Sequence, residues 1–192
     1  MKVGILAVQG DYEAHAAALA RAGAEPVLVR TPGDMRDIDA LILPGGESTT
    51  QLQFLREEGL EQAIRDFAKE KRPIFGTCAG AILLANKVTN PPQESLGLAD
   101  ITVERNAYGR QLSSAVRTGE SDISPAPIEM VFIRAPIIAK AGRGVKVLAE
   151  YNGDPVLVQQ GNILIATFHP ELSADSAVHK YFVKMARNGK TG

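Results

Sequence analysis

Residues 73–84 read PIFGTCAGAILL, an apolar strand that passes through Gly-Thr-Cys-Ala-Gly into an apolar helix. A tight strand-to-helix turn of this kind projects a nucleophile above the carboxyl end of its strand. The two glycines leave room for a strained turn and for close packing of the helix on the strand. An isolated cysteine is more often a small buried hydrophobe. Within this glycine frame the pattern favours Cys78 as a nucleophile.

The chain before this stretch repeats strand, turn and helix. Val3–Val8 is continuously apolar, which is typical of a parallel strand covered on both faces, and a further strand is predicted over Asp39–Leu43. Strands are also predicted over 26–30 and 73–75, and helices over 11–22 with a stop at Gly23, over 48–71 with a break near Gly59, and over 79–87. This order predicts a single α/β domain over residues 1–192, with an open, mostly parallel, flavodoxin-like sheet and helices on both faces.

The second half is richer in short β-like stretches after Pro91-Pro92. These are predicted over 98–103, 111–116, 129–133 and 145–150, followed by a hairpin of 156–159 and 162–167 around Gln160-Gly161. A final helix over about Ser173 to Arg187 closes the domain, and the last residues are expected to fray.

The composition excludes several classes of function. The chain has 192 residues, 21 Lys and Arg against 22 Asp and Glu, and a net charge of −1, so it lacks the polybasic footprint of a nucleic-acid-binding protein. One cysteine and three scattered histidines make a zinc site improbable, and we expect neither metal nor cofactor. The short apolar start runs into Asp11, so we expect no membrane segment and a cytoplasmic location.

A base and an orienting group for the thiol are offered by Phe168-His169-Pro170-Glu171, which follows a predicted strand. The carboxyl end of that strand is where open α/β sheets place their sites. Glu171 is near enough in sequence to hold the His169 imidazole, as the carboxylate does in Ser-His-Asp triads. A surface turn that begins the last helix is the alternative. His15 and His179 lie in helical patterns, which favours a structural or solvated role for both.

A glycine-rich turn follows another predicted strand, in Leu43-Pro44-Gly45-Gly46-Glu47-Ser48-Thr49. It lacks the Gly-Lys-Ser/Thr ending of a P-loop and the GxGxxG frame of dinucleotide sites. Backbone N–H groups there could stabilise an oxyanion, together with the N–H of the residue after the nucleophile. By itself the turn is weak support for any function.

Together these segments resemble the class I, triad-type glutamine amidotransferases over nearly the whole chain. Within that superfamily the resemblance is to the glutaminase subunits of pyridoxal 5′-phosphate synthases. It is carried by segments that occur in the family's order, at 7–10, 44–49, 76–80, 104–111, 132–136 and 169–172. The family usually has Ser-Phe where this chain has Ala107-Tyr108, a mild departure that leaves Arg105 in register.

The resemblance implies the class I glutamine amidotransferase fold and a role for each matched residue. Cys78 would be the nucleophile, with His169 and Glu171 completing the triad. The glutamine substrate would be held by Gly46, Glu47, Ser48, Arg105, Ile133 and Arg134. The backbone N–H groups of Gly46 and Ala79 would meet the oxyanion.

The implied reaction is hydrolysis of L-glutamine to glutamate and ammonia through a thioester. The ammonia would pass to a separate pyridoxal 5′-phosphate synthase subunit, because nothing in this chain remains to use it. Gln9 and Gly10, at the end of the first strand, are candidates for a switch, since they could touch both the glycine-rich turn and that partner.

Other functions stay open at this stage. One is the glutaminase subunit of another ammonia-using synthase, against which the Glu-Arg-Asn and Ile-Arg-Ala-Pro segments count. Another is a Cys-dependent hydrolase or stress protein of the same architecture. In those relatives a histidine usually follows the cysteine, whereas Ala79 follows it here. A non-enzymatic binding module would require all three segments to be coincidental.

Overall fold

The computed structural model describes residues 1–106 and 114–189 of the chain. Within them, a central seven-stranded sheet has the order β10-β11-β12-β4-β3-β1-β2. The strands from β12 to β2 are parallel, and β11 and β10 extend the sheet antiparallel. Their bounds are β1 Lys2–Leu6, β2 Glu25–Val29, β3 Ala40–Leu43, β4 Ile74–Thr77, β10 Lys146–Tyr151, β11 Asp154–Gln160 and β12 Ile163–Ala166. The parallel part has the 2-1-3-4-5 order of flavodoxin-like sheets, so the predicted fold class is confirmed.

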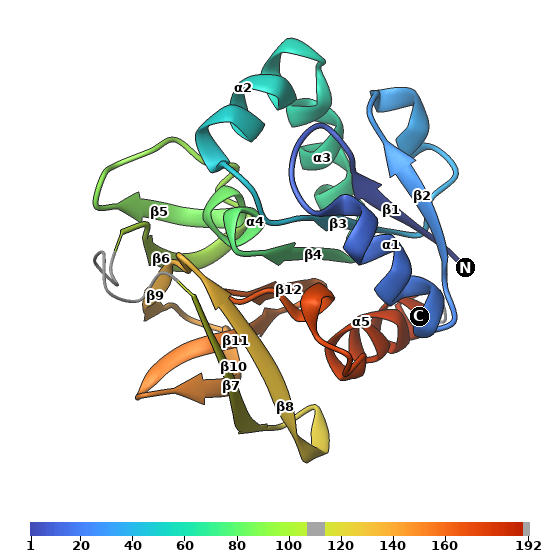
Figure 1. Cartoon of the computed structure of the whole chain (residues 1–192). Helices are drawn as coiled ribbons and strands as arrows, with labels where there is room; N and C mark the ends of the chain where they lie inside the picture. Colours follow the sequence, from blue (N-terminus) through green and yellow to red (C-terminus); the bar gives the residue numbers. More distant parts are fainter. Residues whose placement is uncertain (107–113, 190–192) are drawn as a thin grey trace.

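Helices cover both faces of this sheet (Figure 1). One face carries α1 (Tyr12–Arg21) and α5 (Ala177–Asn188), and the other carries α2 (Ser48–Glu57), α3 (Leu60–Lys69) and α4 (Ala79–Leu84). Gly59 separates α2 from α3 with a φ of 69°, which is the predicted break. None of the helices in the described residues has the length and apolar character needed to span a membrane.

Burial on both faces explains the continuously apolar strands. In β3, Ala40 and Ile42 pack toward α1 and α5, whereas Leu41 and Leu43 pack toward α2, α3 and α4. Because successive side chains point to opposite faces, a strand between two helical layers needs an apolar residue at every position.

The second half of the chain forms the antiparallel edge and two small sheets. β5 (Ala85–Thr89), β6 (Ala99–Glu104) and β9 (Ile137–Ala141) form one of them, and β7 (Ser114–Ser121) and β8 (Ser124–Ile133) form a hairpin. The predicted hairpin of β11 and β12 is present, with Gly161 in its turn at a φ of 56°. The predicted strand over 111–116 falls partly on residues 107–113, which lie outside the described residues, as does the Ala107-Tyr108 departure.

The helix predicted over 79–87 is too long, because α4 ends at Leu84 and the chain continues directly into β5. The carbonyl groups of Leu83 and Leu84 accept hydrogen bonds from Leu96 N–H and Leu98 N–H at 2.7 and 2.9 Å. A distant loop therefore takes the bonds that would otherwise continue the helix. This tertiary contact is invisible in the local pattern.

The last helix begins at Ala177 and not near Ser173. A short 3-10 turn, η2 (Pro170–Leu172), comes first. Ser173 Oγ then accepts from Asp175 N–H at 2.9 Å, and Asp175 Oδ1 accepts from Ala177 N–H at 2.8 Å. Side chains that form hydrogen bonds with nearby backbone groups in this way compete with helix formation and delay the start of the helix.

Strand β9 is a further difference, because no strand was predicted over Ile137–Ala141.

Candidate active site

Cys78 occupies the strand-to-helix turn between β4 and α4. Its φ and ψ of 47° and −101° are strained for a residue with a side chain. A Cβ on Gly80 would lie 2.1 Å from Leu43 O, and a Cβ on Gly76 would lie 2.8 Å from Gly80. Both flanking glycines are thus required by close backbone approach, as the sequence pattern predicts. The strained turn places the Cys78 sulfur at the carboxyl edge of the sheet.

His169 and Glu171 reach the same edge from the neighbouring strand. Thr77 pairs with Ala166 in the parallel register of β4 and β12, and Cys78 N–H donates to Ala166 O at 2.9 Å. The His169 backbone N–H donates to Val131 O of β8 at 2.8 Å, which anchors the residue. Its Nδ1 lies 2.7 Å from Glu171 Oε1, and both side chains are almost fully buried. His169 and Glu171 are therefore hydrogen-bonded to each other at the sheet edge where Cys78 lies, and Cys78 Sγ is 4.0 Å from Ile133 O.

The electrostatics of Cys78, His169 and Glu171 centre on the imidazole. Burial by itself would lower the pKa of His169, but hydrogen bonds and charge from Cys78 and Glu171 outweigh it and raise the pKa to about 10. At neutral pH the His169 side chain is therefore an imidazolium between a sulfur and a carboxylate. Such an imidazolium has a proton ready to give to a leaving group.

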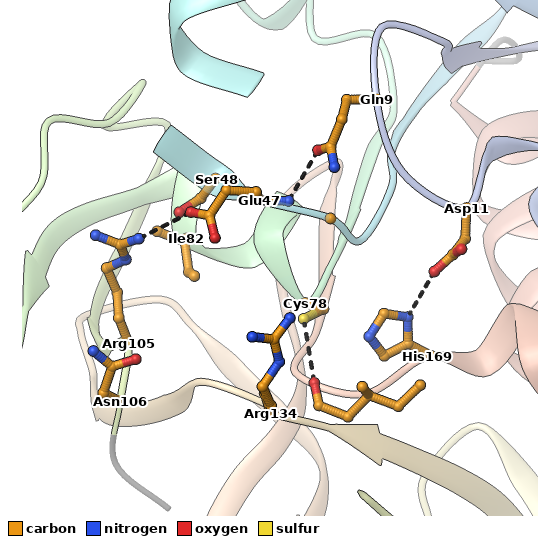
Figure 2. A pocket seen from close by; sticks show the side chains of 12 residues that line it. Gln9, Asp11, Glu47, Ser48, Cys78, Ile82, Arg105, Asn106, Arg134 and His169 are labelled. Atoms are coloured by element: carbon orange, nitrogen blue, oxygen red, sulfur yellow. Dashed lines mark hydrogen bonds and ion pairs between the residues drawn. The ribbon is translucent and has the colours of Figure 1, made fainter. Parts of the chain in front are cut away.

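A cavity of about 290 Å³ opens in front of Cys78 and His169 (Figure 2). All six predicted substrate-binding residues line it, as do Cys78, His169 and Gln9. Within the described residues, the cavity is lined by Gln9, Asp11, Gly46, Glu47, Ser48, Cys78, Ile82, Arg105, Asn106, Ile133, Arg134 and His169. A cavity with few, convergent polar groups beside a perturbed titratable residue is a typical small-molecule site.

The wall opposite the imidazole combines a carboxylate with a guanidinium. Arg105 Nη2 lies 3.3 Å from Glu47 Oε1 and 3.2 Å from Thr49 Oγ1. Arg134 enters the cavity from the turn after β8, where its φ is 43°. Ala79, the other predicted oxyanion donor, is buried directly after Cys78. The cavity can therefore receive a small molecule with both a carboxylate and an ammonium group.

Residues 5–188 match the model of a family described as the SNO glutamine amidotransferase family. The chain belongs to this family.

Two relatives are similar in sequence to the chain over nearly its whole length. "Pyridoxal 5′-phosphate synthase subunit PdxT" of Koribacter versatilis is 54% identical over 192 residues, covering 100% of this chain and 99% of the relative. The protein of the same name from Thermotoga maritima is 47% identical over 188 residues, covering 97% and 100%. These matches confirm the resemblance seen in the sequence.

Solved structures agree with this assignment. A structure described as a glutamine amidotransferase superposes with a TM-score of 0.91 at 45% identity, covering 96% of this chain and 98% of that one. The glutaminase domain of Trypanosoma brucei CTPS superposes with a TM-score of 0.67 at 12% identity, covering 98% and 94%, and shows the shared fold alone. The SNO family chain is thus a class I glutamine amidotransferase in its architecture.

The glycine-rich turn is clamped to the loop after β1. Gln9 Oε1 accepts from Glu47 N–H at 2.9 Å, and a Cβ on Gly10 would lie 1.8 Å from Gly45 O. The buried side chain of Gln51, which sequence reasoning missed, donates through Nε2 to the carbonyl oxygens of Gln9, Pro44 and Gly45 at 3.0, 3.3 and 3.2 Å. The two predicted switch residues therefore do contact the turn.

Asp11 is a second carboxylate beside the imidazole that sequence reasoning missed. It stands at the N-cap position of α1 without accepting a capping hydrogen bond. Its Oδ2 lies 3.7 Å from His169 Nδ1, and its side chain is half exposed at the cavity (Figure 2). Its position directly after Gln9-Gly10 at the end of β1 was the available signal.

Two further histidines, His15 and His179, are completely buried behind the site. Burial lowers the pKa of His15 well below its usual range, and the charges of His179 and His169 add to this. Burial, and then the charge of Arg21, lowers the pKa of His179 to about 3. Both imidazoles are therefore neutral in the folded protein near neutral pH.

Acid is expected to destabilise the fold once the pH falls below 6.5, the ordinary pKa of a histidine. Between 6.5 and about 3 the unfolded chain protonates His179 while the folded chain does not. The stabilisation is complete above pH 6.5 and is lost as the pH falls, by at most about 1.4 kcal/mol per pH unit for one such group. Urea unfolding at several pH values measures the slope. His179→Gln should flatten it, and identical pH dependence in both proteins would contradict this origin.

Proposed function

We propose that this chain is the glutaminase subunit of a pyridoxal 5′-phosphate synthase, in which Cys78, His169 and Glu171 hydrolyse L-glutamine. The observation that carries the proposal is that Cys78 and the hydrogen-bonded pair of His169 and Glu171 lie together at one end of a cavity lined by Glu47, Arg105 and Arg134. The family assignment and the PdxT relatives support it.

The reaction proceeds in two halves. Cys78 Sγ attacks the side-chain amide carbon of glutamine, forming a C–S bond and an oxyanion. The His169 imidazolium gives its proton to the amide nitrogen, and the C–N bond breaks with release of ammonia and a γ-glutamyl thioester. Neutral His169 then takes a proton from water, whose oxygen attacks the thioester carbon. Cleavage of the C–S bond releases glutamate and returns Cys78 and His169 to their starting states.

The oxyanion would be met by backbone N–H groups of Gly46 and Ala79. The Glu47 N–H is already bonded to Gln9, so it is not available to the oxyanion. Ala79 N–H lies at the start of α4, and the first N–H groups of a helix have no partner within the helix. Preformed donors of this kind stabilise charge that develops only in the transition state.

The substrate's main-chain groups would be held at the far end of the cavity. The α-carboxylate would pair with a guanidinium of Arg105 or Arg134, and the α-ammonium with the Glu47 carboxylate. Gly46, Ser48 and Ile133 would complete the wall. This places the amide end of glutamine near Cys78.

The ammonia acceptor would be a separate synthase subunit that makes pyridoxal 5′-phosphate. In water ammonia takes up a proton and loses its nucleophilicity, so transfer requires a sheltered route between the subunits. The cytoplasm fits this reaction, because its reducing conditions keep a thiol nucleophile free.

The test is a glutaminase assay of the purified chain with and without a pyridoxal 5′-phosphate synthase subunit. We expect glutamate to appear much faster with that subunit and not with an unrelated ammonia-using synthase. Equal glutaminase activity with both synthases would contradict the proposed partner, and no glutamate under any condition would contradict the reaction.

Gln9→Ala is expected to reduce partner-stimulated turnover more than it changes glutamine affinity. The substitution removes the acceptor for Glu47 N–H and so frees the turn that carries the oxyanion donor. The cost should be about 1 kcal/mol in the activation free energy, as for one ordinary hydrogen bond, because this bond is exposed to solvent. The measurement is kcat and KM at saturating synthase subunit, with Gln9→Glu as the control that keeps an acceptor oxygen. Full stimulation of Gln9→Ala would end the switch hypothesis.

A further inference from the structure

Behind Glu171, two buried histidines that the mechanism above does not use form a chain of contacts. His15 of α1 places its Nε2 3.4 Å from Glu171 Oε2 and 3.1 Å from Thr77 Oγ1. His15 Nδ1 lies 3.0 Å from His179 Nε2 of α5. His15 and His179 are fully buried, and Glu171 is nearly so. The chain thus joins helices α1 and α5 to the carboxylate that holds His169.

The direction of the hydrogen bonds follows from the neutrality of both imidazoles. A lone pair on His15 Nε2 would face Glu171 Oε2 across 3.4 Å, which is repulsive, so this nitrogen carries the proton and donates it to Thr77 Oγ1 at 3.1 Å. His15 Nδ1 must then accept, and His179 Nε2 donates to it. Two atoms of this chain of contacts have no hydrogen-bond partner in the described residues, Glu171 Oε2 and His179 Nδ1. Both are acceptors, and an unpaired acceptor costs less than an unpaired N–H.

This direction aims one N–H group at each carboxylate oxygen of Glu171, although only Oε1 is hydrogen-bonded and Oε2 is in electrostatic contact alone. His169 Nδ1 holds Oε1 at 2.7 Å, and His15 Nε2 faces Oε2 at the back of the site. Because His15 is neutral, it adds no second positive charge next to the imidazolium. The contact from His15 limits the rotation of the carboxylate from behind.

We propose that His15, oriented by His179, is a positioning residue that fixes the rotation of the Glu171 carboxylate so that Oε1 stays on His169 Nδ1. This inference rests on the proposed function of the triad. Asp11 is the other carboxylate on that nitrogen, at 3.7 Å, and competes for it when Glu171 is free to turn. His15 acts through Glu171 and does not line the cavity.

The first arm of the test is kinetic and compares three variants in the complex with the synthase subunit. His15→Leu keeps the apolar bulk but removes the N–H, and should lower kcat about 10- to 100-fold with little change in KM. His15→Gln offers an N–H at a similar reach, and should recover most of that loss. Leu19→Ala opens a cavity in the same buried face of α1 without a polar change, and should lower the melting temperature but not kcat.

The second arm does not need glutamine hydrolysis. The His169 ring is titrated by ¹⁵N NMR in the full chain. We expect its transition near pH 10 in the wild type and in His15→Gln, and well below that in His15→Leu. This arm separates the positioning role from the glutaminase proposal, because it works with inactive protein.

Several results would overturn the inference. Wild-type kcat and an unmoved His169 titration in His15→Leu would show that Glu171 needs no support from behind. Equal damage in His15→Leu and His15→Gln, or loss of kcat in Leu19→Ala, would show that the packing of α1 matters and the N–H does not.

Discussion

Replacing Cys78 with Ala or Ser is expected to abolish glutamine hydrolysis, by on the order of 10³-fold or more in kcat, while leaving the fold intact. The thiol is the only cysteine of the chain and the group that faces His169 in the cavity. Removing it takes away covalent catalysis altogether. Turnover of the folded variants with the synthase subunit measures the effect, and circular dichroism provides the check on folding.

A glutamine-analogue electrophile gives an independent control. It should label the wild type at Cys78 and leave Cys78→Ala unlabelled, as read by mass spectrometry. Labelling at another residue, or wild-type turnover in a folded variant, would refute the assignment of the nucleophile.

His169→Asn should be nearly as damaging as the loss of Cys78, whereas Glu171→Gln should be milder. The imidazole moves protons in both halves of the reaction, which is worth about 10²- to 10⁴-fold. The carboxylate only orients it and stabilises its charge. Asp11 also lies 3.7 Å from His169 Nδ1 and can partly replace Glu171.

The comparison of kcat for the two single variants tests this order. The double variant Asp11→Asn, Glu171→Gln should be worse than Glu171→Gln alone, and Asp11→Asn alone should have a small effect. Negligible losses from both His169→Asn and Glu171→Gln would remove this pair from the mechanism.

The first half of the fold could be predicted because its strands are buried on both faces. Such strands stand out as unbroken apolar runs, and Gly23 and Gly59 mark helix ends through their positive φ values. The end of α4 and the strand β9 could not be predicted, since both depend on contacts with distant parts of the chain. The bonds from Leu96 and Leu98 to the end of α4 are one example.

The candidate site was predictable where a short motif carries its chemistry. Cys78, His169 and Glu171 belong to two such motifs, and adjacent parallel strands bring them together. Asp11 and His15 belong to no motif. His15 does share a spacing with Ala18 and Leu19 that marks the buried face of α1, so its burial was predictable although its contact with Glu171 was not. That contact depends on how α1 packs on the sheet.

Gly45 of the glycine-rich turn packs directly against the His169 imidazole. A methyl group at this position would lie 2.4 Å from His169 Cε1 and 2.9 Å from Nδ1, so any side chain there displaces the imidazole. The two elements cannot be varied independently, and substitutions in them should be strongly epistatic. A redesign of this enzyme for a bulkier amide therefore has to change the turn and the position of the histidine together. A side chain added to the turn alone would displace the imidazole and inactivate the enzyme.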